Sequence, residues 1–175
     1  MPQQKQFKVL LIGDSCVDEW VYGSCDRLSP EAPIPVMKYR EKQSAPGMAA
    51  NVHENLKSLG INVNFLTNKE SITKTRYIDE KSNQQIMRYD EEPKIEPLSF
   101  DFPKEWNNEY DALVISDYDK GYLTSEDLLT LCNHFNRPVF IDTKKTRLFQ
   151  KDNVYWKINK KEFDALDKDY LPDDT

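Results

Sequence analysis

Acidic, basic and amide side chains follow four short apolar segments of this sequence, each at the point where the segment ends. Such segments are typical of buried strands, and ligands of open α/β sheets bind outside the carboxyl ends of the strands. One aspartate there is equally well explained as a helix cap or turn residue, but four such ends together indicate a site for a polar ligand. The side chains concerned are Asp14, Asp18, Asp117, Lys120, Asp142, Lys144 and Asn159.

Two further segments carry residues suited to a polar or anionic small molecule. In PGMAAN (46–51), the small residues let a ligand approach the backbone, and Asn51 in the first helical turn could bind a pair of sugar hydroxyls. The alternative is close packing of helix on sheet. In TKTR (73–76), Lys74 and Arg76 share one face of a strand. The lysine ammonium and the planar arginine guanidinium could together hold a phosphate there. A solvated strand face is the commoner reason for such a pair.

The elements that must position these residues alternate between strand and helix. The pattern predicts an α/β protein with a largely parallel sheet and helices on both faces, in one domain over 1–175. Two extended pieces near 20–23 and 34–40, joined by a proline-rich segment, read as a small flap outside the main sheet. Segment 93–108 reads as a connection. Expected strands are 7–13, 61–67, 112–116, 139–142 and 154–158, expected helices are 47–59, 125–135 and one from 160, and 73–79 with 84–89 form a hairpin.

Charge, hydropathy and the absence of several motifs disfavour a number of functional classes. The 175 residues carry a net charge of −6, which disfavours a nucleic-acid surface, and no apolar run is long enough to span a membrane. Three cysteines without a CxxC pattern favour a reduced, cytoplasmic protein. His53 and His134 have no ligand set typical of zinc around them, and the sequence contains no GxxxxGK[ST], GxGxxG or GxSxG motif.

Taken together, several segments resemble the N-terminal half of a ribokinase-like carbohydrate kinase. Among such kinases the resemblance is to the D-glycero-D-manno-heptose 7-phosphate kinase domain of bifunctional enzymes of ADP-heptose synthesis. It extends over about residues 8–166, and the long block at 22–36 is its most specific part. The matching segments, in family order, are LIGDSCVD (11–18), YGSCDRLSPEAPIPV (22–36), PGMAANV (46–52), TKTR (73–76), SDYDKG (116–121), IDTK (141–144) and NKKE (159–162).

The resemblance implies a role for each matching position. Asp14 and Asp18 would lie at the sugar, and Gly47 and Asn51 would start the sugar-binding helix. The flap would be a β lid, with strands at about 17–42 and 73–90, that covers the sugar and mediates homodimerisation or pairing with a full-length kinase. Lys74 and Arg76 would face the substrate phosphate, and the region of Asp117, Lys120, Asp142, Lys144, Asn159 and Glu162 would organise Mg²⁺ and the phosphates of ATP.

The sequence also departs from the family pattern. Met48 and Asp119 replace usual glycines, and only 68–71 remain of a strand–helix–strand stretch. The GxGD element, which carries the family's catalytic base and anion hole, is not found in this sequence. Three functions follow as expectations: a sugar-phosphate-binding pseudokinase, an ATP-dependent kinase acting alone or completed by another chain with Asp117 or Asp142 as base, and a lid-mediated interaction or regulatory module.

Overall fold

The computed structural model describes residues 6–99, 103 and 105–167. These residues form two compact units. The first, the parallel-sheet unit, comprises the described residues of Met1–Ser15, Met48–Glu70 and Lys94–Thr175; the second, the four-stranded unit, comprises Cys16–Gly47 and Ser71–Pro93. The expected lid strands at about 17–42 and 73–90 fall within the four-stranded unit. Each unit is described by itself below.

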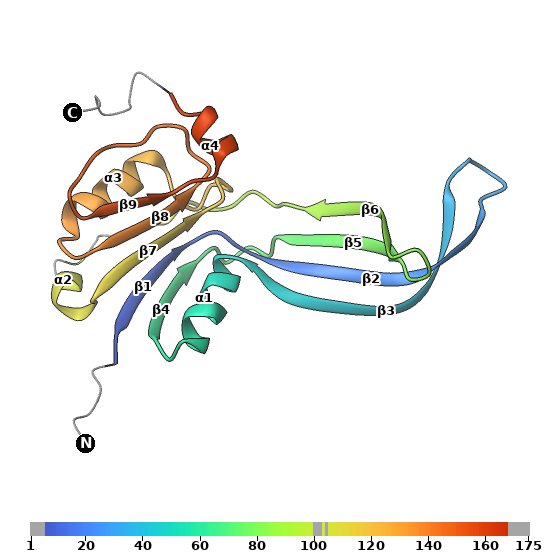
Figure 1. Ribbon diagram of the computed structural model, residues 1–175, viewed down its shortest axis with the longest axis horizontal. Helices are drawn as coiled ribbons and strands as arrows, with labels where there is room; N and C mark the ends of the chain where they lie inside the picture. Colours follow the sequence, from blue (N-terminus) through green and yellow to red (C-terminus); the bar gives the residue numbers. More distant parts are fainter. Residues whose placement is uncertain (1–5, 100–102, 104, 168–175) are drawn as a thin grey trace. The chain divides into compact units, whose positions relative to one another are not determined.

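The parallel-sheet unit contains a five-stranded sheet in the order β4-β1-β7-β8-β9, with every neighbouring pair parallel (Figure 1). Strand β1 is central to the core, since Leu10, Leu11 and Ile12 are fully buried. The continuous apolar run of β1 is what a parallel strand covered on both faces requires. The strands are β1 (Lys8–Gly13), β4 (Asn62–Thr67), β7 (Ala112–Asp117), β8 (Val139–Thr143) and β9 (Val154–Lys157).

Four helices belong to this unit, and their ends follow from side-chain chemistry. Helix α3 (Ser125–His134) begins with a capping box, in which Thr124 and Asp127 satisfy each other's backbone N–H groups. Helix α4 (Lys160–Asp164) begins with the same device between Asn159 and Glu162. Helix α1 (Ala49–Ser58) ends before Gly60, whose φ of 76° only glycine adopts easily, and α2 (Trp106–Glu109) is a single turn.

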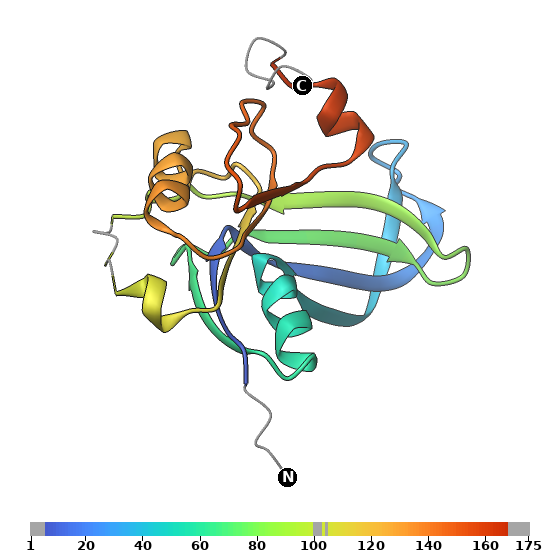
Figure 2. The ribbon, with the colours of Figure 1, turned by 60° about the vertical axis from the view of Figure 1, so that its left-hand side comes forward.

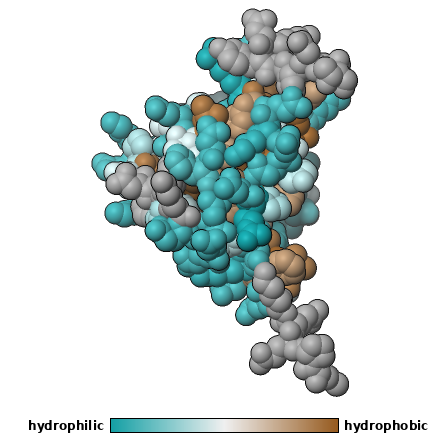
Figure 3. Space-filling view, turned by 90° about the vertical axis from the view of Figure 1, so that its left-hand side faces the viewer, coloured by the Kyte–Doolittle hydropathy of each residue, from teal (hydrophilic) through white to brown (hydrophobic). Residues whose placement is uncertain are grey.

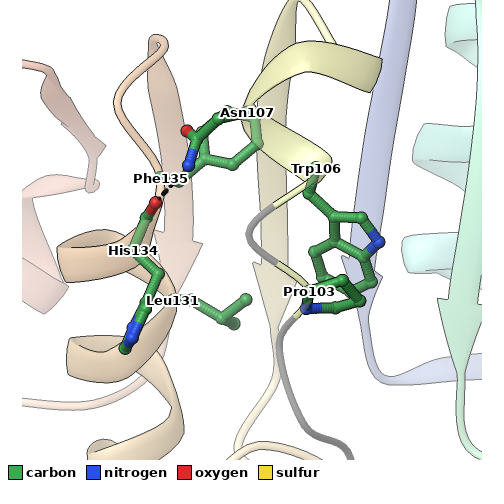
Figure 4. Close-up of a pocket in the computed structure, with 6 residues that line it drawn as sticks. All are labelled: Pro103, Trp106, Asn107, Leu131, His134 and Phe135. Atoms are coloured by element: carbon green, nitrogen blue, oxygen red, sulfur yellow. Dashed lines mark hydrogen bonds between the residues drawn. The ribbon is translucent and has the colours of Figure 1, made fainter.

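The junction between α2 and α3 is held by one amide side chain. Asn107 Nδ2 donates to the carbonyl of His134 at 2.5 Å, and Asn107 Oδ1 accepts from the N–H of Asn136 at 2.6 Å. Beside it lies a cavity of about 10 Å³, lined also by Trp106, Leu131 and neighbouring residues (Figure 4). That volume holds at most about one water molecule, so this junction is structural.

The four-stranded unit has the strand order β3-β2-β5-β6. Strands β2 (Ser15–Leu28) and β3 (Pro35–Met48) are long, and β5 (Thr73–Asp79) and β6 (Gln84–Glu91) form an antiparallel hairpin. Figure 2 shows these strands bending along their length. Because side chains alternate across a strand, one face of this sheet carries Asp18, Lys74 and Arg76, and the other carries Val21 and Tyr77.

The sequence-based expectations for the elements are largely confirmed. The expected parallel α/β sheet, its five strands, the helices near 49, 125 and 160 and the hairpin are all present. Two expectations were wrong in detail. The flap strands are much longer than 20–23 and 34–40, since β3 continues through Pro46 and Gly47. Segment 93–108, expected as a connection, ends within the short helix α2. Pairing with neighbouring strands extends segments whose own alternation is weak.

The described residues contain no helix long and apolar enough to cross a membrane. The surface seen in Figure 3 is mostly hydrophilic, with apolar residues in small groups. Charged residues make up 31% of the chain, which agrees with this surface.

Candidate functional site

The charged face of the four-stranded unit brings together four of the predicted residues. Asp18 and Lys74 are register partners across β2 and β5, and Trp20 and Arg76 are the next pair on the same face. Arg76 Nη1 donates to Asp18 Oδ1 at 2.7 Å, and its guanidinium lies 5.7 Å from the centroid of the Trp20 ring. Planar recognition of oxyanions and stacking on an aromatic ring are both characteristic of arginine.

Gly47 is the fourth predicted residue in this group. A Cβ atom at position 47 would collide with Asp18 Oδ2 and with Cys16 Sγ. Only glycine therefore lets β3 lie this close to the Asp18 carboxylate. Burial raises the pKa of the Cys16 thiol to about 11, and the Asp18 carboxylate adds to this. Cys16 is therefore a neutral packing residue rather than a nucleophile at neutral pH.

Arg88 belongs to the charged face, and the sequence analysis missed it. It is the register partner of Arg76 across β5 and β6. Its guanidinium donates two hydrogen bonds to Asp90, at 2.7 and 2.8 Å, and Asp90 is in turn opposite Lys74. Lys74 Nζ lies 3.8 Å from Glu92. The face thus presents Lys74, Arg76 and Arg88 as cations, with carboxylates between them that keep them apart.

Asp14 in the parallel-sheet unit organises the loop that follows β7. It is fully buried, and its two carboxylate oxygens accept hydrogen bonds from the backbone N–H groups of Tyr118, Lys120 and Tyr122. Burial raises the pKa of Asp14, and these N–H donors oppose the rise. The predicted residues Asp14 and Lys120 are therefore adjacent, and the geometry gives Asp14 a loop-holding role. A direct contact with substrate stays a prediction.

Asp117 forms the centre of a second charged cluster, in the parallel-sheet unit. Its carboxylate is buried and accepts from Thr143 Oγ1 at 2.6 Å and from Lys145 Nζ at 2.8 Å. Lys145 also pairs with Asp119 at 2.9 Å. Burial by itself would lower the pKa of Lys145, but the two carboxylates outweigh it and raise that pKa. Lys145, which was not among the predicted residues, is thus the lysine that faces Asp117.

Lys144 and Asp142, two further predicted residues of this unit, each form an ion pair. Lys144 bonds to Glu162 and lies 5.5 Å from the centroid of the Tyr118 ring. Asp142 pairs with Lys157 at 2.7 Å. Asn51, expected at the sugar, is an exposed residue in the first turn of α1. Asn51 belongs to the parallel-sheet unit and Gly47 to the four-stranded unit, so their pairing at a sugar stays a prediction.

Asn159 and Glu162 form hydrogen bonds with each other at the start of α4, and Glu162 also bonds to Lys144. Glu162 Oε2 accepts from the N–H of Asn159 at 2.8 Å, Asn159 Oδ1 accepts from the N–H of Glu162 at 3.0 Å, and Glu162 Oε1 bonds to Lys144. The N–H of Asn159 and then Lys144 lower the pKa of Glu162. Both carboxylate oxygens of Glu162 are thus bonded within the protein, and a role of this pair at Mg²⁺ stays a prediction. Within the described ranges, no group of three or more His, Cys, Asp or Glu could hold a metal ion.

Two positions where this sequence replaces a family glycine have positive φ. Met48, at the start of α1, has φ 53° and ψ −131°, and Asp119 has φ 56°. Asp tolerates the left-handed region better than Met, because its short polar side chain can hydrogen-bond locally. The backbone at both positions therefore has the form that glycine favours, although the residue is another.

This combination of a parallel α/β unit with a four-stranded β unit is the fold of ribokinase-like carbohydrate kinases. The solved structures that share the fold include Escherichia coli phosphofructokinase-2 in complex with potassium, with a TM-score of 0.55 and 16% identity over 92% of this chain and 62% of that one. They also include a carbohydrate kinase from Agrobacterium tumefaciens, with a TM-score of 0.51 and 12% identity over 78% of this chain and 53% of that one.

Relatives found by sequence define the family more narrowly than the solved structures do. The Bifunctional protein HldE of a Nitratiruptor species is 33% identical over 188 residues, which cover 89% of this chain and 40% of the relative. A protein of the same name from Helicobacter pylori is 35% identical over 174 residues, 78% of this chain and 37% of the relative. No family model matches. The resemblance is confirmed: the chain is a homologue of the HldE bifunctional proteins with a ribokinase-like fold, and it spans about 40% of their length.

Proposed function

We propose that this chain binds a sugar phosphate of the heptose 7-phosphate type through the charged face of the four-stranded unit. The observation that carries the proposal is the Asp18 carboxylate held between Arg76 and Gly47, with Lys74 and Arg88 on the same face. A carboxylate can accept hydrogen bonds from sugar hydroxyls, and the cations can bind the phosphate. The homology to HldE proteins supports this choice of ligand.

We further propose that the residues of this chain do not transfer a phosphoryl group by themselves. Both aspartates considered as a base are engaged, Asp117 with Lys145 and Thr143, and Asp142 with Lys157. The proposal places the protein in the cytoplasm, where its three cysteines, all free in the structure, would stay reduced. Binding of ATP and Mg²⁺ belongs to the alternative, a kinase completed by another chain.

The test is thermal unfolding of the purified chain with heptose 7-phosphate, the unphosphorylated heptose and ATP with Mg²⁺. Sugar phosphate at about 100 times its dissociation constant should stabilise the fold by roughly 2.7 kcal/mol. Charge-assisted hydrogen bonds contribute about 1.5–3 kcal/mol each, so Asp18→Asn and Arg76→Gln should each weaken binding by about tenfold or more. The unphosphorylated sugar should bind less tightly.

Matched controls exist in the same unit. Asp26 pairs with Lys81, and Arg40 pairs with Glu80, so Asp26→Asn and Arg40→Gln each remove one exposed ion pair that involves neither Asp18 nor the cations proposed to bind the phosphate. Both should leave binding unchanged. If Asp18→Asn binds as the native chain does, the charged face is not the sugar site. Stabilisation by ATP with Mg²⁺, followed by turnover, would instead support the kinase alternative.

A second function, self-association through the opposite face of the same unit, is supported by a separate observation. Val21, Met37, Tyr39, Tyr77 and Met87 line an apolar cavity of about 630 Å³, together with Ile34, Pro35 and Ile86. Several of these side chains are largely exposed, Tyr39 by 67% and Met87 by 51%. Such an apolar sheet face is a typical protein-binding surface. We propose that it pairs with a second copy of this chain, and a full-length kinase is the alternative partner.

A further inference from the structure

Among the residues that the structure describes, one face of the parallel sheet is covered by a helix over only about half of its width. Parallel register places five residues, one per strand, in a row on this face. Exposure rises from the second residue of this row to the fifth, since Leu11 is fully buried, Phe140 is 47% exposed and Tyr155 is 52% exposed. The row runs Phe65, Leu11, Val114, Phe140 and Tyr155.

Helix α1 provides the cover of the buried half. His53 of α1 stacks on Phe65 with ring centroids 5.0 Å apart, and α1 packs against β4, β1 and β7. On the other face of the sheet, the residues of the central strands β7 and β8 are buried, for example Leu113, Val139 and Ile141. Figure 1 shows α1 beside β4 and β1.

The exposed half presents a defined pattern rather than scattered side chains. Phe140 and Tyr155 stack with centroids 5.3 Å apart and planes at 21°. Two residues further along the same two strands, on the same face, Asp142 and Lys157 form an ion pair. The patch is therefore an apolar pair of rings with a polar end, which suits an amphipathic partner.

The exposed half of this sheet face, formed by β8 and β9, has the width and length of one helix. Strands lie about 4.8 Å apart and a helix is about 10 Å wide, so one helix covers about two strands. The five residues of β8 span about 16 Å, which a helix of about ten residues matches. Helix α1 has that length and covers the adjacent half in the same layer. A neighbouring helix would complete the layer.

The comparisons point to the source of such a helix. The chain covers 40% of the Nitratiruptor HldE protein and 62% of phosphofructokinase-2, which has the same fold. Both therefore contain polypeptide that this chain does not match. We infer that the Phe140–Tyr155 face is a docking surface for an amphipathic helix from the part of an HldE-type kinase that lies outside the stretch matched by this chain. The inference is independent of the sugar site.

The experiment uses the full 175-residue chain, tagged, and the residues of the Nitratiruptor HldE protein outside its matched stretch as a separate polypeptide. The two are produced together, purified through the tag and examined by light scattering, and their affinity is measured by titration. We expect a 1:1 complex. Phe140→Asp and Tyr155→Lys should each weaken it at least about tenfold, because interface energy concentrates in buried aromatic anchors.

Leu129 is the matched control, since it is 44% exposed on α3. Leu129→Asp should leave the affinity within about twofold. Circular dichroism shows whether each variant is folded, and Tyr155→Lys, at the edge strand, serves if Phe140→Asp does not fold. The inference is overturned if the folded chain forms no complex, or if both variants bind like the native chain. It is also overturned if the native chain forms a dimer that Phe140→Asp dissociates, because a second copy would then be the occupant.

Discussion

At the scale of single residues, the molecule uses its charges mostly in internal pairs. Asp14 was predicted as a ligand residue from its place after a strand, but it binds three backbone N–H groups of a loop about 100 residues later. Sequence could place Asp14 at the rim and could not show which loop returns to it. Likewise, nothing in the adjacent pair Lys144 and Lys145 shows which of them faces Asp117.

Met48 allows a prediction about backbone strain. Met48→Gly and Met48→Ala both remove a side chain that is only 7% exposed, so both variants should be less stable than the native chain. Gly in the middle of a helix or strand normally destabilises the fold relative to Ala by about 0.5–1 kcal/mol. Because Met48 has φ 53°, we expect this order to reverse here, with Met48→Gly more stable than Met48→Ala by about 1 kcal/mol in urea unfolding.

The next residue but one provides the control. Ala50 lies within α1, where the backbone is helical, so Ala50→Gly should be less stable than the native chain by about 1 kcal/mol. If Met48→Ala is as stable as Met48→Gly, the positive φ at this position stores no strain.

At the scale of elements, the order of strands and helices could be read from apolar runs, prolines and capping residues, while register could not. The hairpin shows why. Asp79 is opposite Gln84, and without an irregularity Arg76 would be opposite Met87. A bulge between Tyr77 and Ile78 shifts the register by one residue, and Arg88 becomes the partner of Arg76. A shift of one residue exchanges the faces of a strand, so Arg88 joins the charged face only through the bulge.

The turn of this hairpin yields a prediction on pH. Asp79 accepts from the Ser82 hydroxyl and from the N–H groups of Cys25 and Ser82, and these bonds lower its pKa, the hydroxyl most. A carboxyl whose folded pKa is lowered stabilises the fold above its unfolded pKa of about 3.9 and loses that contribution as pH falls further. Asp79→Asn should therefore be less stable than the native chain at pH 7, and the difference should shrink below about pH 4.

Hydrogen exchange measures this locally. The amides of Cys25 and Ser82 should exchange faster in Asp79→Asn than in the native chain at neutral pH, because their acceptor is weakened. Unfolding in urea at several pH values gives the stability difference. A difference that stays constant down to about pH 3 would show that the bonds to Asp79 do not distinguish its two protonation states.

At the scale of the whole molecule, the two proposed functions would use opposite faces of one sheet, that of the four-stranded unit. Alternation along β2, β5 and β6 places Asp18, Arg76 and Arg88 on one face and Val21, Tyr77 and Met87 on the other. Ligand binding and association could thus occur on one small unit without competing for the same side chains. Composition alone gives no hint of this division, because it depends on which residues alternate rather than on how many there are.

The oligomeric state tests the apolar face directly. If that face pairs with a second copy, the native chain should sediment as a dimer that dissociates on dilution, and Tyr39→Asp or Met87→Asp should shift it to monomer, since a buried unpaired charge opposes association. Leu59→Asp is the control, because Leu59 is 74% exposed at the end of α1 in the other unit. It should leave the dimer intact. Since the charged face lies on the opposite side of the sheet, Met87→Asp should still bind sugar phosphate, so monomeric chains that retain binding would separate the two proposals. A native chain that remains monomeric at all concentrations would remove self-association and leave a full-length kinase as the partner to be tried on the same face.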